Sequence, residues 1–222
     1  MTYEHLKHSL ELCARAYDDE QTYCPCRIHT IDDMESGIQC YIRVYENSLK
    51  IAFRGTDTAE DRIRDLRFWK KKIPYGNYSS KIRVHSGFID AYKSKRVREE
   101  IHEQITDNTR HIEVSGHSLG AAMAVLCAID INYNFPHVDL EAVLFGCPRV
   151  GNRAFARSYN NRVFKTFRVE NNNDVVTKIP PAVFGYHHVG IPIHIGAIRL
   201  PFWISFVAHW PREYYKNLMK KT

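Results

Sequence analysis

The sequence predicts an α/β fold with a mostly parallel central sheet flanked by helices. Residues 112–126 read as a short strand, a sharp turn at residues 116–120 and a long apolar helix. Further strand candidates at residues 141–146 and 162–169 each end in a polar turn, which repeats the alternation of strand and crossover. Strands in this alternation pair in parallel, and the reactive groups of parallel sheets gather beyond the carboxyl ends of the strands.

The segments before residue 112 predict the remaining elements. Apolar residues at helical spacing predict a covering helix over residues 3–17, and the Asp, Pro and Thr content of residues 18–38 predicts a loop. Residues 39–45 and 49–53 flank a short turn, a pattern typical of two antiparallel strands. Residues 85–105 carry spaced apolar side chains among many charges, which predicts a helix packed on one face.

Composition places the chain among ordinary globular proteins. It has 222 residues, of which 44% are hydrophobic and 25% charged, with no break in composition. These values exclude a disordered or fibrous chain and predict one domain over residues 1–222. The net charge of +6 is too small to predict nucleic-acid binding without a basic stripe and stacking aromatics, and an anionic membrane surface fits it as well.

Cysteine placement and the N-terminus bear on the compartment. The six cysteines lie unevenly, and Cys127 and Cys147 fall within apolar runs that commonly bury free thiols, so we expect no disulfide framework. Cys24-Pro25-Cys26 lacks the second ligand pair of a zinc site and predicts a surface turn. The first residues show no secretory signal, and no apolar run reaches the roughly 18 residues that span a membrane.

Ser118 is the predicted nucleophile. It stands at the apex of the strand-to-helix turn, where a tight corner strains the backbone and leaves room only for small residues two positions away. Gly116 and Gly120 occupy those positions. The following helix aims unpaired amides at the serine, and these amides favour negative charge. A plain glycine turn is the alternative interpretation of the same pattern.

A serine hydroxyl reacts when a base takes its proton and a carboxylate orients that base. Asp174 is the predicted carboxylate, because it lies in a polar turn just past the strand candidate that ends at Val169. Glu170 is the nearer rival. Asp130 lies about three helical turns, roughly 18 Å, from the apex and should point away from the site.

Several histidines are candidates for the base. His85 and His117 lie near predicted site loops, but His117 is the serine's immediate neighbour, so its side chain should leave the turn on the other side. The usual chain order of serine, acid and histidine in such sheets leaves a later group of candidates open. They are His187, His188, His194 and His209. His209 closes an apolar stretch, residues 200–208, suited to wall a dry, lipid-lined pocket.

The oxyanion formed by attack needs donors already aimed at it. The amide of Leu119, just past the nucleophile, is one expected donor. The other should come from the loop after Phe53, residues 54–56, where Gly55 permits a close approach.

Residues 57–74 are a candidate lipid contact. They combine a short helical pattern with Phe68 and Trp69 beside the lysines of residues 70–72. Aromatic side chains next to lysines suit a membrane interface. A solvated charged face with one buried aromatic pair is the alternative.

Taken together, these motifs resemble the class 3 lipases, the fungal triacylglycerol lipase-like branch of the α/β-hydrolases. The resemblance covers most of the chain, with its motifs in matching order and spacing. They are Ala52-Phe-Arg-Gly-Thr56, Val84-His-Ser-Gly-Phe88, Gly116-His-Ser-Leu-Gly120, Phe145-Gly-Cys-Pro-Arg-Val-Gly-Asn152, Asn173-Asp-Val-Val176, Ile179-Pro-Pro181 and Tyr186-His-His-Val-Gly190.

The resemblance implies a catalytic triad of Ser118, Asp174 and His209. In this family the base is a late histidine followed five residues on by a tyrosine, and His209 with Tyr214 fits that pattern. It also implies the α/β-hydrolase fold.

The resemblance further implies Thr56 and Leu119 as the oxyanion hole, with residues 57–74 in the place of the fungal lid. The implied activity is a serine carboxylester hydrolase that cleaves glycerolipid acyl esters through an acyl-enzyme, with no cofactor and no metal. A soluble-ester or feruloyl-type esterase and a lipid-binding module with a vestigial triad are the alternatives. The chain is shorter than the secreted fungal lipases and shows no signal, so we expect an intracellular, cytoplasmic location.

Overall fold

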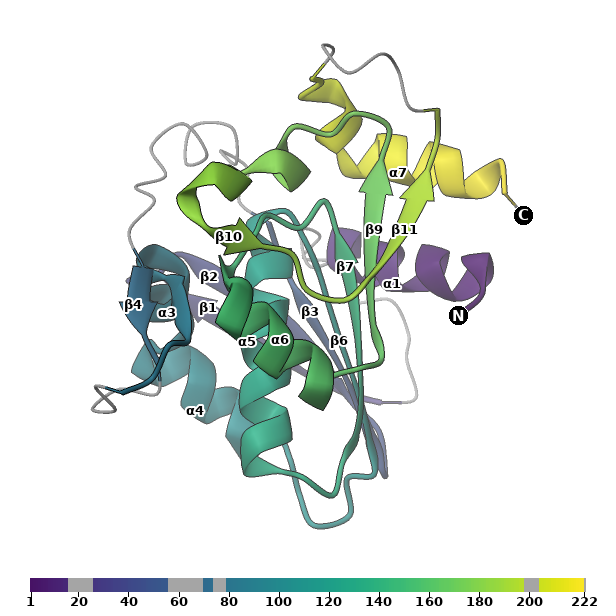
Figure 1. Cartoon of the computed structure of the whole chain (residues 1–222). Helices are drawn as coiled ribbons and strands as arrows, with labels where there is room; N and C mark the ends of the chain where they lie inside the picture. The colour runs from purple at the N-terminus through teal and green to yellow at the C-terminus, as the bar shows by residue number, and fades with distance from the viewer. Residues whose placement is uncertain (16–25, 56–69, 74–78, 198–203, 222) are drawn as a thin grey trace.

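The structure is a computed structural model that describes residues 1–15, 26–55, 70–73, 79–197 and 204–221 (Figure 1). Its centre is a seven-stranded sheet in the order β1-β2-β3-β6-β7-β9-β11. Strands β1 to β3 pair antiparallel, and every neighbouring pair from β3 to β11 is parallel, which confirms the predicted mostly parallel sheet. The bounds are β1 Arg27–Asp33, β2 Ile38–Val44, β3 Ser48–Phe53, β6 His111–His117, β7 Asp139–Phe145, β9 Thr166–Asn171 and β11 Ile191–Ile195.

Helices cover both faces of this sheet. Helices α1 and α7 pack on one face, where their apolar side chains form a small core with β7, β9 and β11 (Figure 1). Helices α3, α4, α5 and α6 lie on the other face over the larger core (Figure 1). The bounds are α1 Tyr3–Arg15, α3 Ser86–Tyr92, α4 Lys95–Glu103, α5 Leu119–Asn134, α6 Arg153–Arg162 and α7 Pro211–Met219.

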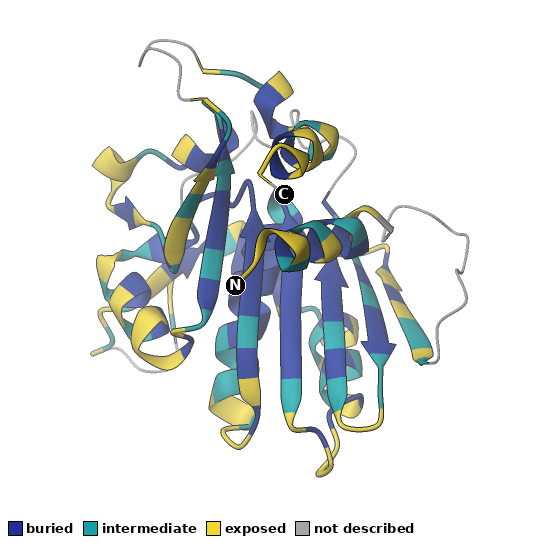
Figure 2. Ribbon diagram, turned by 90° about the vertical axis from the view of Figure 1, so that its right-hand side faces the viewer, coloured by how far each residue is buried: buried dark blue, intermediate teal, exposed yellow. Residues whose placement is uncertain are grey.

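Helix α5 is the central helix of the larger core. Its residues from Gly120 to Ala128 are all buried, because the sheet lies on one side and α3 and α6 on the other. Figure 2 shows the same pattern for the sheet, whose middle strands are buried along most of their length. Small side chains at Ala121, Ala122 and Ala124 let the first turns of the helix lie close to β6 and β3.

A second, four-stranded sheet in the order β10-β8-β5-β4 lies against α3 and α6. Two 3-10 helices, η1 and η2, follow β9, and a third, η3, follows β11. The bounds are β4 Lys70–Lys72, β5 Arg83–His85, β8 Gly151–Asn152, β10 Tyr186–His187, η1 Val176–Lys178, η2 Ala182–Phe184 and η3 Val207–His209.

The structure corrects three of the predicted elements. Part of the predicted loop at residues 18–38 is strand β1, which pairs with β2 along its whole length. The predicted helix at residues 85–105 is two helices, because Ser94 adopts an extended ψ of 137° and caps α4 by accepting from the Val97 amide. The strand predicted from residue 162 begins at Thr166, since α6 continues through Arg162.

The predicted lipid-contact segment lies mostly outside the described residues, which include only its positions 70–73. There, Lys70–Lys72 form strand β4, paired with β5, rather than a helix. None of the described helices is long and apolar enough to cross a membrane. The location of the protein stays a prediction.

The cysteines differ from expectation at one position. Cys13, Cys40, Cys127 and Cys147 are free and buried, as apolar surroundings predict. Cys26, which was expected in a plain surface turn, is disulfide-bonded. The expectation of no disulfides rested on thiols within apolar runs, and Cys26 lies in a polar segment at the start of the described strand region.

Candidate active site

Ser118 lies at the corner between β6 and α5, buried and with φ 59° and ψ −126°. Residues other than glycine adopt such a positive φ only at a cost of about 1–3 kcal/mol. Its amide donates to the Phe145 carbonyl of β7 at 2.9 Å, and its carbonyl accepts from the Ala121 amide of the helix at 3.0 Å. Backbone bonds on both sides therefore hold the strained turn.

Two glycines make the turn possible. A Cβ on Gly116 would lie 2.3 Å from the carbonyl oxygen of Gly120, and a Cβ on Gly120 would lie 2.4 Å from the carbonyl oxygen of Phe53. Real Cβ atoms do not approach backbone so closely, so each position accepts only glycine. The second contact also fixes the first turn of α5 against the end of β3.

Asp174 and His209 are brought together from segments 35 residues apart. His209 Nδ1 lies 2.8 Å from Asp174 Oδ2, and the tautomer that donates from Nδ1 to this carboxylate leaves Nε2 as the acceptor nitrogen. Both residues are buried, with His209 5% exposed and Asp174 1% exposed. Their loops also pair through the backbone, because Ser205 forms a parallel bridge with Asp174.

The carboxylate of Asp174 has two further donors. The hydroxyl of Tyr214 donates to the same Oδ2 at 2.6 Å, and the amide of Val176 donates to Oδ1 at 2.8 Å. Burial and the neighbouring carboxylate raise the pKa of Tyr214, so its hydroxyl stays protonated as a donor. These three contacts satisfy buried carboxyl oxygens that would be costly to leave without hydrogen bonds.

Gly146 lies between Asp174, His209 and the Ser118 turn. It follows Phe145, the residue that accepts the Ser118 amide, and its φ is +56°. A Cβ here would lie 2.8 Å from His209 Cε1 and 3.0 Å from Asp174 Oδ2. Gly146 belongs to the motif at residues 145–152, but that motif alone assigns it no role. Its contacts with Asp174 and His209 are seen only in the folded structure.

Ser118 Oγ and His209 Nε2 are both buried, and neither has a hydrogen-bond partner among the described residues. The serine and the imidazole are therefore not bonded to each other in this structure. Contacts through Gly146 and through His117, whose ring centroid lies 4.6 Å from that of His209, place the two groups at the same carboxyl edge of the sheet.

The other predicted histidines lie elsewhere. His188 donates to the Thr177 carbonyl at 2.8 Å, and burial with nearby Arg168 lowers its pKa to about 3. His187 and His194 are exposed on β10 and β11. His85 accepts the Phe88 amide as the N-cap of α3.

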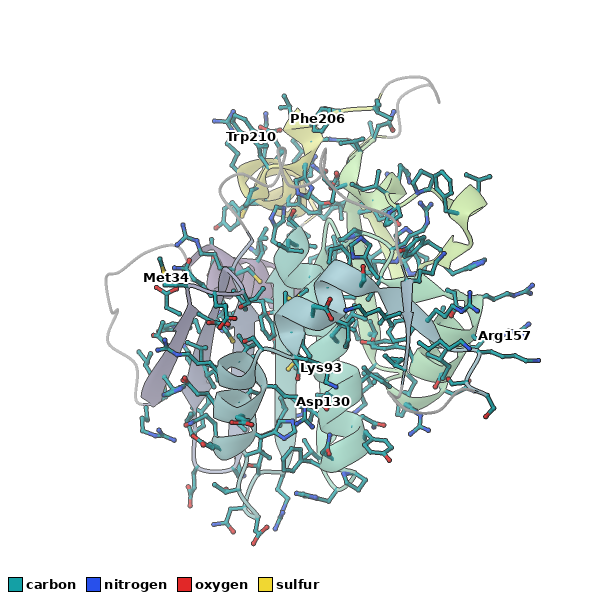
Figure 3. The ribbon with its side chains drawn as sticks, turned by 90° about the vertical axis from the view of Figure 1, so that its left-hand side faces the viewer. Met34, Lys93, Asp130, Arg157, Phe206 and Trp210 are labelled. Carbon is teal, nitrogen blue, oxygen red and sulfur yellow. The ribbon has the colours of Figure 1, made fainter. Side chains whose placement is uncertain are left out.

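The rival carboxylates are also paired away from His209. Glu170 pairs with Arg168 and with Lys178. Asp130 receives bonds from Arg98 and His102, which lower its pKa against the effect of burial. Figure 3 places Asp130 far down the molecule from Trp210, which caps the helix next to His209.

One prediction about direction is wrong. His117 does not turn away from the site: its Nε2–H donates to the backbone carbonyl of His209 at 2.7 Å. His117 is the last residue of β6, and its ring packs against His209 from the loop before α7.

The predicted oxyanion donors are only partly described. Leu119 is the first residue of α5, so its amide has no acceptor within the helix. Gly120 packs on Phe53 and Arg54, which places the end of β3 beside this amide. Thr56 lies outside the described residues, and its role stays a prediction.

A separate group with metal-ligand chemistry lies under α1. His5 Nε2 is 3.1 Å from Glu113 Oε2 and 3.3 Å from Glu141 Oε1. Glu113 precedes the end of β6 by four residues, so this group is remote from the Ser118 turn. Lys50 Nζ lies 3.8 Å from Glu113, and the group reads as a structural ion-pair cluster.

Known proteins identify the family. The model of the family described as Lipase (class 3) matches residues 50–184, more than half of the chain. The chain belongs to the class 3 lipase family. This class 3 lipase chain is 33% identical over 180 residues to phospholipase A(1) DAD1, chloroplastic, of Arabidopsis thaliana, which covers 73% of this chain and 40% of that protein.

Two further similarities agree with that assignment. The lipase of Rhizomucor miehei is 34% identical over 153 residues, covering 65% of this chain and 41% of that protein. A solved structure described as a serine protease triad forming the catalytic centre of a triacylglycerol lipase matches with a TM-score of 0.73 and 28% identity, over 86% of this chain and 78% of that chain. The chain spans about two fifths of the length of the curated relatives it matches.

Proposed function

We propose that this class 3 lipase chain is a serine carboxylester hydrolase that cleaves acyl esters of glycerolipids through an acyl-enzyme on Ser118. The observation that supports this most is the 2.8 Å hydrogen bond between Asp174 and His209, at the edge of the sheet that carries the serine. Family membership supports the reaction class, since the matched family is that of lipases.

The proposed reaction follows from the tautomer that Asp174 imposes. Ser118 Oγ attacks the acyl carbonyl carbon while its proton passes to His209 Nε2, and Asp174 stabilises the imidazolium that forms. His209 then returns this proton to the departing alcohol oxygen, which leaves an acyl group on Ser118. A water molecule then attacks the acyl carbon while one of its protons passes to His209, and His209 gives that proton to Ser118 Oγ as the acyl–oxygen bond breaks, which releases the fatty acid and restores the serine.

The amides at the corner complete the proposed site. The Leu119 amide and the loop at Thr56 would bind the oxyanion, and one such donor contributes about 10²–10³ in rate. Ser118 needs no metal for this reaction, because the charge that develops on the carbonyl oxygen is met by backbone donors at a helix N-terminus.

A lipid substrate is favoured by the surface around the base. Ile204, Val207 and Trp210 are 64%, 55% and 42% exposed, although His209 between them is buried. Arg212 stacks on Trp210 with its guanidinium carbon 4.3 Å from the ring centroid, an amphipathic pair suited to a lipid surface. We propose that this loop and residues 57–74 contact the lipid transiently.

A substrate panel tests the proposed activity. We expect turnover of acylglycerol emulsions and phospholipid vesicles by the wild-type chain, and loss of turnover by about 10⁴-fold or more in Ser118→Ala. Nitrophenyl esters of increasing chain length measure the acyl preference. Activity on soluble esters with no gain at a lipid surface would favour the soluble-ester alternative, and a folded chain with no turnover would favour a binding module.

Vesicle sedimentation tests the proposed lipid contact. Trp210→Ser should weaken binding to anionic vesicles while hydrolysis of a soluble short-chain ester changes little. Tyr133→Ser is the matched control, because Tyr133 is 73% exposed near the far end of α5. Equal binding by both variants would contradict a contact at the base loop.

A further inference from the structure

The candidate site divides into two pieces, the first of which joins two segments of chain that lie 35 residues apart. One piece carries the acid and the base, held together by the carboxylate bond to His209 and by the Ser205 amide, which donates to the Asn173 carbonyl at 3.0 Å. Asn171 adds a third tie, since its Nδ2 donates to the Ala208 carbonyl at 2.9 Å. The other piece, residues 111–134, carries the serine on β6 and α5.

His117 joins these two pieces. Its Nε2–H donates to the His209 carbonyl at 2.7 Å, and its ring packs on the His209 ring with an interplanar angle of 30°. The rings of His117 and Tyr214 also pack edge to face, with centroids 5.7 Å apart and an interplanar angle of 82°. Within the described parts of the chain, this is the only hydrogen bond between residues 111–134 and residues 204–221.

We propose that His117 is a positioning residue, which fixes the imidazole of His209 relative to Ser118 by holding the backbone of the base. The inference rests on the proposed function, since it assigns His117 to the serine-histidine reaction. The geometry supports this role, because residue 117 is directly bonded to the nucleophile and its side chain contacts residue 209 directly. A shift of either piece would then change the distance over which the proton moves.

A neutral imidazole suits this task. Burial, reinforced by the adjacent His209, lowers the pKa of His117 to about 3, so it stays uncharged when His209 carries a proton during the reaction. A cation 4.6 Å from His209 would oppose formation of the imidazolium. His117 therefore supplies a hydrogen bond and packing without an opposing charge.

Paired substitutions separate positioning from general stability. His117→Leu removes the donor and keeps an apolar side chain of moderate size, whereas His117→Gln keeps an amide N–H that can reach the same carbonyl. Ser115→Ala is the matched control, because Ser115 is buried on the same strand and donates to the Ile51 carbonyl at 3.4 Å, away from the base.

The measurements are kcat and KM on a soluble short-chain ester, the urea midpoint, and hydrogen exchange of residues 204–214. We expect His117→Leu to lower kcat about 10- to 100-fold with KM within about twofold, since small misplacement of a catalytic group has costs of this order. His117→Gln should recover most of kcat. Exchange in residues 204–214 should rise in His117→Leu and not in Ser115→Ala.

Failure of this inference differs from failure of the proposed function. If His117→Leu keeps the kcat of Ser115→Ala at a similar urea midpoint, or leaves exchange of residues 204–214 unchanged, His117 does not position the base. If the wild-type chain lacks turnover while exchange responds to His117→Leu as expected, the tie between the two pieces stands and the hydrolase proposal is wrong.

Discussion

Gly146 occupies a left-handed backbone position that faces both Asp174 and His209. Gly146→Ala should lower kcat/KM by about 10²-fold or more, because the new Cβ would start 2.8 Å from the imidazole and displace it. Ester turnover and the urea midpoint measure the effect. Gly185→Ala is the matched control: its φ is also positive, at +74°, but the nearest side-chain atom is Lys70 Nζ at 3.9 Å.

The two glycine variants share the backbone cost of about 1–2 kcal/mol for a left-handed residue. Only Gly146→Ala adds the clash at the site. We therefore expect the backbone cost to lower the stability of both variants by a similar amount. Activity should fall in Gly146→Ala alone. Equal activity losses in the two variants would contradict the assignment of the site to this edge of the sheet.

Tyr214 donates to the same carboxylate oxygen that His209 uses. Tyr214→Phe should destabilise the chain by about 1.5–3 kcal/mol, the range for a hydrogen bond to a charged group, and lower kcat several-fold because Asp174 loses a fixed donor. Tyr215→Phe is the control, since that neighbouring hydroxyl is partly exposed and bonds Glu11 at 3.3 Å. No effect of Tyr214→Phe on either quantity would contradict a role for this hydrogen bond in holding Asp174.

The sequence predicts the serine of the candidate site better than it predicts the histidine. The pattern around Ser118 requires small flanking residues for steric reasons, so the serine is readable from sequence. The choice among the histidines is not readable, because His187, His188, His194 and His209 all follow Asp174, and only tertiary packing decides which ring meets Asp174. The direction of His117 was mispredicted for the same reason.

Ser94 separates two helices that sequence periodicity merges. Its hydroxyl accepts the Val97 amide at 3.3 Å and donates to Asp33 Oδ2 at 2.5 Å, which ties α4 to β1. Ser94→Ala should destabilise the chain by about 1–2 kcal/mol, as for other lost caps, while kcat stays unchanged. Urea unfolding and ester turnover check this, with Ser94→Thr as the variant that keeps the cap; loss of kcat in Ser94→Ala would show that α4 affects the site.

Elements at the edges of the sheet were hardest to predict. In β1 only Ile31 and Asp33 are buried, and in β11 only Ile195 is, because each edge strand has one paired side and faces solvent over much of its length. The polar sequence of β1 then resembles a loop. The central strands β6 and β7 are buried almost throughout, so their apolar runs are visible in the sequence.

Helix α6 shows where a readable signal was missed. Asn152 accepts the Phe155 amide as its N-cap, and Phe155, Ala156 and Tyr159 lie on its buried face. A capping residue followed by apolar residues at this spacing predicts a helix. The many arginines and asparagines of the segment, which face solvent in the structure, mask that pattern.

Buried neutral histidines make the stability of the whole chain depend on pH. The pKa values of His117 and His188 are lowered to about 3 from 6.5, chiefly by burial. At pH values between about 3 and 6.5, the unfolded chain binds protons at these histidines that the folded chain does not. The stability of the folded chain therefore falls as the pH drops from about 6.5 toward 3. Each histidine contributes a slope of up to about 1.4 kcal/mol per pH unit.

His188→Gln tests this dependence away from the base. The substitution keeps an amide donor for the Thr177 carbonyl but does not titrate. The urea midpoint of the variant, measured from pH 7 to pH 4, should fall less steeply than that of the wild-type chain. An identical slope would show that His188 is not held neutral by the fold.

The arrangement of the whole molecule gathers the site at one edge. Ser118 follows β6, Gly146 follows β7 and Asp174 lies past β9, so parallel neighbours deliver these residues to adjacent carboxyl ends. His209 reaches the same edge from the C-terminal segment, through Ser205 and α7. Three distant parts of the chain thus depend on one sheet for their alignment.

Labelling with a fluorophosphonate, followed by peptide mapping, is the sharpest test of Ser118 as the nucleophile. We expect one adduct per chain, located on Ser118, formed much more slowly in His209→Gln and absent in Ser118→Ala. A folded wild-type chain that forms no adduct, an adduct on another residue, or an unchanged labelling rate in His209→Gln would contradict it.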